Sequence, residues 1–122
     1  MTSTELVVIG AGPGGYTAAF RGADLGLSVT LIDTDTKPGG VCLNRGCIPS
    51  KALLHAAKVI SDANEAKDIG VTFSAPSLDI EKLRAWKDGI VTKLTGGLTQ
   101  LAKARKVTLI QGQAKFLNAK TL

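Results

Sequence analysis

The sequence predicts an α/β fold of the Rossmann type, with a parallel sheet of which the chain holds only the first part. Short apolar segments of strand type alternate with longer helical patterns, which is typical of parallel strands joined through helices. A glycine-rich turn follows the first segment, as in dinucleotide-binding folds. Three strand segments are present, and a doubly wound sheet needs more, so we expect an incomplete, N-terminal portion of such a domain.

Residues 5–33 form a βαβ unit. Leu6–Ile9 is an apolar run that ends at a glycine, like a buried parallel strand. Residues 16–25 are rich in Ala and Gly and predict a helix, which Gly26 closes as its C-terminal cap. Ser28–Ile32 predicts the second strand, and the crossover between the two strands is expected to be right-handed.

A glycine- and cysteine-bearing loop is predicted over residues 37–47. A helix should then run from near Pro49 to about Asp68, since proline is favoured in a first turn. Residues 70–78 are expected to be irregular or weakly extended.

A long amphipathic helix is predicted over residues 81–106, before a third strand at Val107–Ile110. Gly96 and Gly97 interrupt its pattern, at roughly 1 kcal/mol per glycine relative to alanine, and indicate a kink or a close backbone approach. The apolar positions of this helix form one continuous stripe: Leu83, Trp86, Ile90, Leu94, Leu98 and Leu101.

The composition excludes several classes of protein. The 122 residues are 44% hydrophobic, which is too apolar for disorder, and no apolar run approaches the roughly 18 residues of a membrane span. The N-terminus lacks the features of a secretory signal, so a cytoplasmic location is the default expectation. Aromatic residues amount to 4% and the net charge of +5 is dispersed, so we expect neither a nucleic acid nor a membrane as partner.

The six residues that begin at Gly10 fit the dinucleotide motif G-x-G-x-x-G, with Pro13 and Gly14 inside it. Gly10 permits the tight turn, Gly12 lets a pyrophosphate approach the backbone, and Gly15 lets the helix pack against the sheet. The N-terminus of that helix would face the phosphate. A glycine turn without a ligand is the alternative, but the strand before and the helix after are the context that the motif requires.

Asp33 ends the second strand, 18 residues beyond Gly15. A carboxylate here would accept hydrogen bonds from a ribose diol and disfavour a 2′-phosphate. The alternative is an Asp that simply ends a strand in a turn. Because FAD and NAD share an ADP moiety, these residues do not distinguish the two.

Cys42 and Cys47 lie five residues apart. In a regular helix their Cα atoms would be roughly 8–9 Å apart, and a disulfide needs less than about 7 Å. If the two are bonded, the segment must bend, and Gly46 supplies backbone freedom. The helix that begins near Pro49 should lower the pKa of the Cys47 thiol, and Lys51 adds positive charge.

A pair so placed is suited to thiol–disulfide exchange, but alternatives remain on these residues alone. Two unrelated buried thiols or a structural disulfide are possible, and Lys51 would then be a surface lysine. A metal site lacks the usual four ligands, and His55, the one histidine, lies in an apolar helical run as a packing residue.

The combination of motifs resembles the dihydrolipoamide dehydrogenase family, within the class I pyridine nucleotide-disulfide oxidoreductases. The likeness spans nearly the whole chain. It rests on the glycine turn and on five further segments: Gly39–Asn44, Gly46–Leu53, Arg84–Lys87, Leu94–Leu98 and Arg105–Val107.

This resemblance implies that residues 1–122 are the N-terminal portion of an FAD-binding domain, with the redox disulfide in segment 39–51. The glycine turn would hold the FAD pyrophosphate and Asp33 the adenosine ribose. Cys42 would be the interchange thiol, Cys47 would stack on the flavin, and Lys51 would sit near its reactive nitrogen. Further cofactor contacts are implied for Gly39, Gly40, Val41, Cys42 and Ala114.

Three positions depart from the family pattern. Asp33 stands where Glu is usual, Ala114 where a glycine backbone meets the adenine, and Arg45 where Val is common. Arg45 is expected to alter the electrostatics at the disulfide, in a direction that the sequence does not indicate.

The resemblance also implies a function for the whole protein. It would oxidise dihydrolipoyl groups of 2-oxoacid dehydrogenase complexes and pass electrons through Cys42 and Cys47 to FAD and then to NAD. The lipoyl domain would be its partner and a homodimer its working form, with the NAD domain, the dimerisation domain and a His–Glu base pair beyond Leu122. Alternatives are a mercuric- or glutathione-type reductase, or a catalytically silent, truncated FAD-binding fragment.

Overall fold

The computed structural model describes residues 3–122. It contains a parallel sheet of three strands, β1 (Leu6–Ile9), β2 (Val29–Asp33) and β3 (Thr108–Gln111), in the order β1-β2-β3. Both pairings are parallel. The predicted fold class is confirmed, because helices connect parallel strands in an open sheet, as in a partial Rossmann-type domain.

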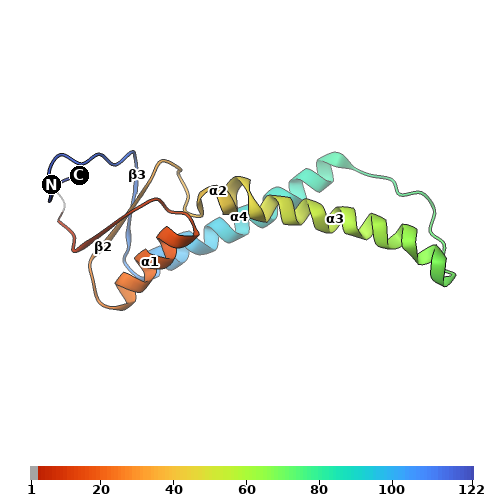
Figure 1. Ribbon diagram of the computed structural model, residues 1–122, viewed down its shortest axis with the longest axis horizontal. Helices are drawn as coiled ribbons and strands as arrows, with labels where there is room; N and C mark the ends of the chain where they lie inside the picture. Colours follow the sequence, from red (N-terminus) through yellow and green to blue (C-terminus); the bar gives the residue numbers. More distant parts are fainter. Residues whose placement is uncertain (1–2) are drawn as a thin grey trace.

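The helices divide the molecule into two regions. Figure 1 shows the sheet and α1 at one end, and a long pair formed by α3 and α4 that extends away from them. The helical elements are α1 (Pro13–Asp24), α2 (Gly40–Arg45), α3 (Cys47–Glu65), the 3-10 turn η1 (Ala66–Ile69) and α4 (Ile80–Ala104).

The βαβ unit forms as predicted, with one shift at the start of its helix. α1 begins at Pro13 rather than at residue 16, because a proline in the first turn loses no helical hydrogen bond. Gly26 follows the end of α1 with φ of 90°, and its N–H donates to the carbonyl of Ala23 at 3.0 Å. Gly26 therefore ends the helix as expected.

One expectation for the middle of the chain is corrected. Residues 37–47 were expected to form a loop, but they contain α2, whose Leu43 is buried. Burial of Leu43 stabilises a helical turn here, although the two adjacent glycines and the weak hydrophobic periodicity of the segment predict no helix. The helix expected from near Pro49 to about Asp68 is present, because α3 runs from Cys47 to Glu65 and η1 continues it to Ile69.

α4 is continuous through Gly96 and Gly97. A Cβ at either position would have no atom of the described chain within 4 Å, so the close backbone approach, one of the two possibilities for these glycines, is not found there. The nine residues 71–79 before α4 have no regular structure, as predicted.

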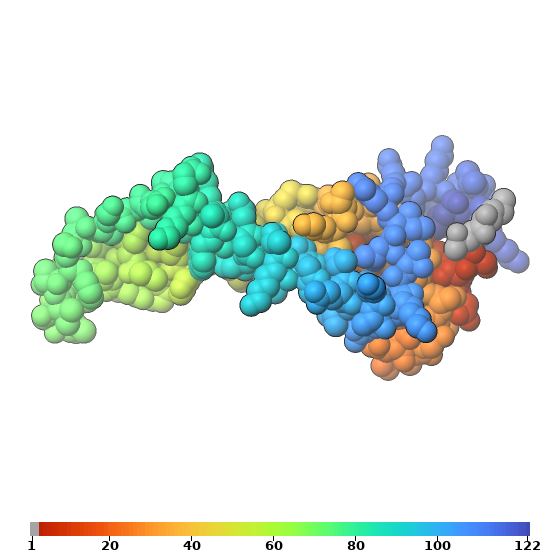
Figure 2. Space-filling view, turned by 180° about the vertical axis from the view of Figure 1, so that it is seen from behind, coloured from red at the N-terminus to blue at the C-terminus, as the bar shows by residue number. Residues whose placement is uncertain are grey.

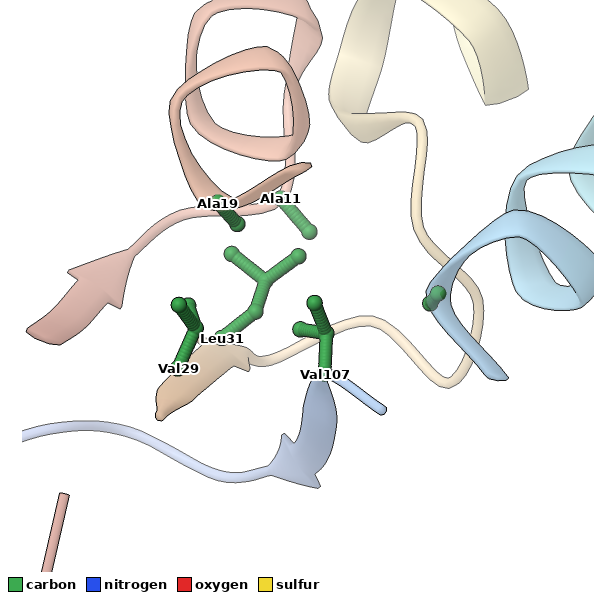
Figure 3. Close-up of a cluster of buried hydrophobic side chains, with 6 residues drawn as sticks. Ala11, Ala19, Val29, Leu31 and Val107 are labelled. Atoms are coloured by element: carbon green, nitrogen blue, oxygen red, sulfur yellow. The ribbon is translucent and has the colours of Figure 1, made fainter. Parts of the chain in front are cut away.

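The hydrophobic core lies between the sheet, α1 and the C-terminal end of α4, which contributes the fully buried Ala102. Leu31 is 1% exposed and points toward Ala11 and Ala19, with Val29 and Val107 beside it (Figure 3). The α3–α4 pair contrasts with this region, since Trp86 on the apolar stripe is 44% exposed. Figure 2 shows this arm, green to cyan, projecting from the orange and blue region that holds the sheet.

No helix in the described part of the chain combines the length and apolar character that crossing a membrane requires.

Candidate functional site

Two glycines of the turn after β1 are required by the backbone conformation and packing of the chain, independently of any ligand. Gly10 has φ of 95°, a conformation that disfavours side chains, and its N–H donates to the carbonyl of Ile32 at 2.7 Å. A Cβ at Gly15 would overlap the carbonyl oxygen of Gly10. These contacts tie the turn to both strands and bring α1 close to the end of β1, as the motif predicts.

Gly12 differs, because nothing in the described chain lies within 4 Å of the place a Cβ would take. Gly12 is also the N-cap of α1, which has no capping side chain and no acidic residue in its first turn. The first turn of a helix carries unpaired N–H groups and partial positive charge. A pyrophosphate group fits this open, positive position.

Asp33 lies at the end of β2 and faces the turn. Its Oδ2 accepts a hydrogen bond from the N–H of Ala11, and its Oδ1 accepts one from the N–H of Asp35 at 2.8 Å. Burial raises the pKa of Asp33, but the hydrogen bonds that it accepts outweigh burial, and the net pKa lies below the ordinary value. The carboxylate therefore stays charged and keeps lone pairs for a ribose diol.

A cavity of about 130 Å³ opens beside Asp33, between the ends of β2 and β3. Ala114 is not among the residues that line it. Two of the lining residues, Asp33 and Asp35, are acidic. The remaining lining residues are uncharged: Ala11, Leu31, Thr36, Pro38, Leu109, Ile110 and Gln111.

The segment that leads to the cysteines meets the glycine turn through its backbone. The N–H of Gly39 donates to the carbonyl of Ala11 at 2.7 Å. Gly40 has φ of 60°, and a Cβ on it would lie 2.6 Å from the Cα of Gly12. The structure thus brings Gly39 and Gly40 to the dinucleotide motif, 24 or more residues away in sequence from Gly15.

Cys42 and Cys47 form a disulfide, with their Cα atoms 4.8 Å apart. The chain bends at Gly46, between α2 and α3, and a Cβ at Gly46 would lie 3.0 Å from the carbonyl oxygen of Val41. The bend that a bonded pair requires is confirmed. Gly46 permits this bend because its lack of a side chain lets α2 and α3 pack closely.

Cys47 is the first residue of the 19-residue helix α3, which has no capping side chain. The positive end of α3 therefore stabilises negative charge on this sulfur once the disulfide is reduced. Lys51 lies exposed one helical turn later. Val41, the neighbour of Cys42 on α2, is 65% exposed.

His55 is exposed on α3, with its ring centroid 6.2 Å from that of Trp86 on α4. Residues 3–122 contain no group of three or more His, Cys, Asp or Glu side chains that could hold a metal ion.

The sequence did not reveal a partner for Arg45. Its guanidinium donates to both carboxylate oxygens of Asp35, from Nη1 at 3.1 Å and from Nη2 at 2.8 Å. The hydrogen bonds with Asp35 and its charge raise the pKa of Arg45. The only signal in the sequence was that Arg45 departs from the family pattern, since its pairing with Asp35 depends on how the nine residues between them fold.

Comparisons with known proteins agree with this geometry. The sequence model of the family described as pyridine nucleotide-disulphide oxidoreductase matches residues 4–122. The chain is 56% identical to dihydrolipoyl dehydrogenase of Haemophilus influenzae over 98% of its length. It is 52% identical to the protein of that name in Vibrio cholerae over 97%, and 53% identical to that of Thermus scotoductus over 95%. The chain spans 25% of the length of each relative.

Proposed function

The chain belongs to the pyridine nucleotide-disulphide oxidoreductase family, and we propose that it provides the flavin-binding and thiol-redox part of a dihydrolipoamide dehydrogenase. The observation that carries this proposal is the backbone contact between Gly40 and Gly12, because it places the Cys42–Cys47 segment directly on the dinucleotide turn. The names of the relatives support the same activity.

In this proposal, the residues of the turn hold FAD. The N–H groups at the start of α1, with Gly12, Pro13 and Gly14 around them, receive the pyrophosphate, and Asp33 receives the adenosine ribose. The empty space beside Gly12 and the charged carboxylate of Asp33 fit these two groups. Further contacts are assigned to Gly39, Gly40, Val41, Lys51 and Ala114.

The disulfide supplies the thiol chemistry. A thiolate of the dihydrolipoyl group attacks Cys42 Sγ and forms a mixed disulfide, while Cys47 leaves as a thiolate at the N-terminus of α3. The second substrate thiol then attacks the mixed disulfide, which releases the oxidised lipoyl group and the Cys42 thiolate. When bound, FAD supplies two-electron transfer between this dithiol and NAD.

The partners and location follow from the same proposal. The substrate would be carried by the lipoyl domain of a 2-oxoacid dehydrogenase complex, and the working enzyme would be a homodimer. We place it in the cytoplasm, where a disulfide is more often catalytic or redox-sensing than structural.

The complete gene product that contains these residues tests the proposal. We expect it to bind FAD and to reduce NAD with dihydrolipoamide as electron donor. The Cys42→Ser and Cys47→Ser variants should keep bound FAD and lose turnover. An intact, flavin-loaded protein that does not oxidise dihydrolipoamide, but reduces glutathione disulfide or mercuric ion, would contradict the proposed substrate.

A further inference from the structure

Arg45 joins the disulfide segment to the dinucleotide cavity. It is the last residue of α2 and lies between the two cysteines. Its two hydrogen bonds to Asp35, at 3.1 and 2.8 Å, form a bidentate pair, the geometry in which arginine recognises a carboxylate most specifically. We call this pair the Arg45–Asp35 clamp.

Asp35 belongs to the cavity as much as Asp33 does. Both side chains line it, and the N–H of Asp35 donates to the Asp33 carboxylate. The other residues of the cavity lining are uncharged. Without Arg45, two neighbouring carboxylates would therefore face the space beside an anion-binding turn, and like charges weaken the binding of an anionic ligand.

We propose that Arg45 is a positioning residue for dinucleotide binding, which acts through Asp35 by neutralising the second carboxylate at the adenosine end of the cavity. The inference rests on the proposed FAD-binding function. It assigns a role to a residue that departs from the family pattern, and it requires no direct contact between Arg45 and the dinucleotide.

The Arg45–Asp35 clamp also joins the two ends of the segment 35–45. Residues 35–45 include Gly39 and Gly40, which touch the glycine turn, and Cys42, which bonds to Cys47. Arg45 is 58% exposed and Asp35 27%, and such pairs contribute little to the free energy of unfolding. The consequence of the clamp should therefore appear in ligand binding rather than in stability.

The test compares four variants of the complete gene product, stripped of flavin and titrated with FAD and with ADP. Arg45→Met removes the charge and should weaken both ligands by about 3- to 10-fold at low ionic strength. Asp35→Asn in the Arg45→Met background removes the unpaired carboxylate, and should restore affinity to within about twofold of the wild type. Arg45→Lys keeps a positive charge and should stay within about threefold.

Arg84→Met is the matched control, because it breaks another exposed pair, with Glu81 at 2.8 Å on α4. It should leave both affinities unchanged. Raising the ionic strength to about 0.5 M should reduce the loss in Arg45→Met, since salt screens charges. Melting temperatures within about 2 °C of the wild type would show that every variant is folded.

The outcomes separate the two proposals. Wild-type protein that binds neither ligand overturns the proposed function and this inference together. Wild-type protein that binds FAD, with Arg45→Met binding it equally well, overturns this inference alone. A double variant as weak as Arg45→Met, or Arg45→Lys as weak as Arg45→Met, would also overturn it, because neutralisation of Asp35 would not be the cause.

Discussion

The sheet end of the molecule and the arm formed by α3 and α4 are built on different principles. At the sheet end, backbone meets backbone, as at Gly15 against Gly10 and Gly40 against Gly12, and Leu31 is almost fully buried. On the arm, helices of good amphipathic pattern leave Trp86 and Leu94 more than 40% exposed. The difference teaches that close backbone contacts and a few buried side chains fix the structure at the sheet end, whereas part of the apolar stripe on the arm stays exposed among the described residues.

The largest effect should come from Gly15→Ala. Its Cβ would overlap the Gly10 carbonyl, so the turn or α1 must move, and we expect at least about 3 kcal/mol of lost stability. Denaturant unfolding measures this loss. Gly14→Ala in the same turn of helix is the control, because its Cβ meets open space; equal stability of the two variants would refute the backbone-contact explanation.

The two regions can next be compared by making the same kind of substitution, Leu→Ala, once in each. Leu31→Ala at the sheet end should cost about 2–5 kcal/mol, whereas Leu94→Ala on the arm should cost about 1 kcal/mol or less, because Leu94 is 42% exposed. Unfolding of the complete gene product measures both. A loss for Leu94→Ala as large as that for Leu31→Ala would mean that another surface covers the arm.

Gly12→Ala should separate binding from folding. Since a Cβ there would have no atom of residues 3–122 within 4 Å, we expect a change of less than about 0.5 kcal/mol in unfolding free energy. FAD affinity should fall by at least about tenfold, because the methyl group occupies the approach of the pyrophosphate. Unchanged FAD affinity in titrations would remove Gly12 from the proposed site.

The smallest effect concerns the pH dependence of stability. The pKa of Asp33 is lowered in the folded protein, so its contribution is present above the unfolded pKa and is lost as pH falls through the folded value. Asp33→Asn should therefore reduce the loss of stability seen below about pH 4. Identical acid-unfolding profiles for the variant and the wild type would contradict this role.

Local sequence predicted the parts of the site that obey steric rules. The motif glycines, the end of α1 at Gly26 and the bend required by a bonded Cys42–Cys47 pair follow from backbone geometry over a few residues. α2 was missed because its glycine-rich start resembles a loop and burial of Leu43 decides its structure. The Arg45–Asp35 clamp depends on how the nine residues between its two members fold, which no local pattern specifies.

The sequence also could not predict that the apolar side chains of the arm would be exposed. The stripe that includes Trp86 and Leu94 shows which residues share a face of α4, but a periodic pattern does not say what covers that face.

The visible absorption spectrum of the complete gene product tests the central claim most directly, namely that the Cys42–Cys47 disulfide and the glycine turn form one flavin site. We expect the oxidised protein to show bound flavin, and reduction by dihydrolipoamide to produce a long-wavelength charge-transfer band. Neither serine variant holds a disulfide to reduce, so both are compared without reductant: Cys47→Ser should weaken this band, and Cys42→Ser, which keeps the Cys47 thiol, should keep or strengthen it. A protein that binds no flavin, or a band lost only in Cys42→Ser, would contradict the claim or reverse the roles of the two cysteines.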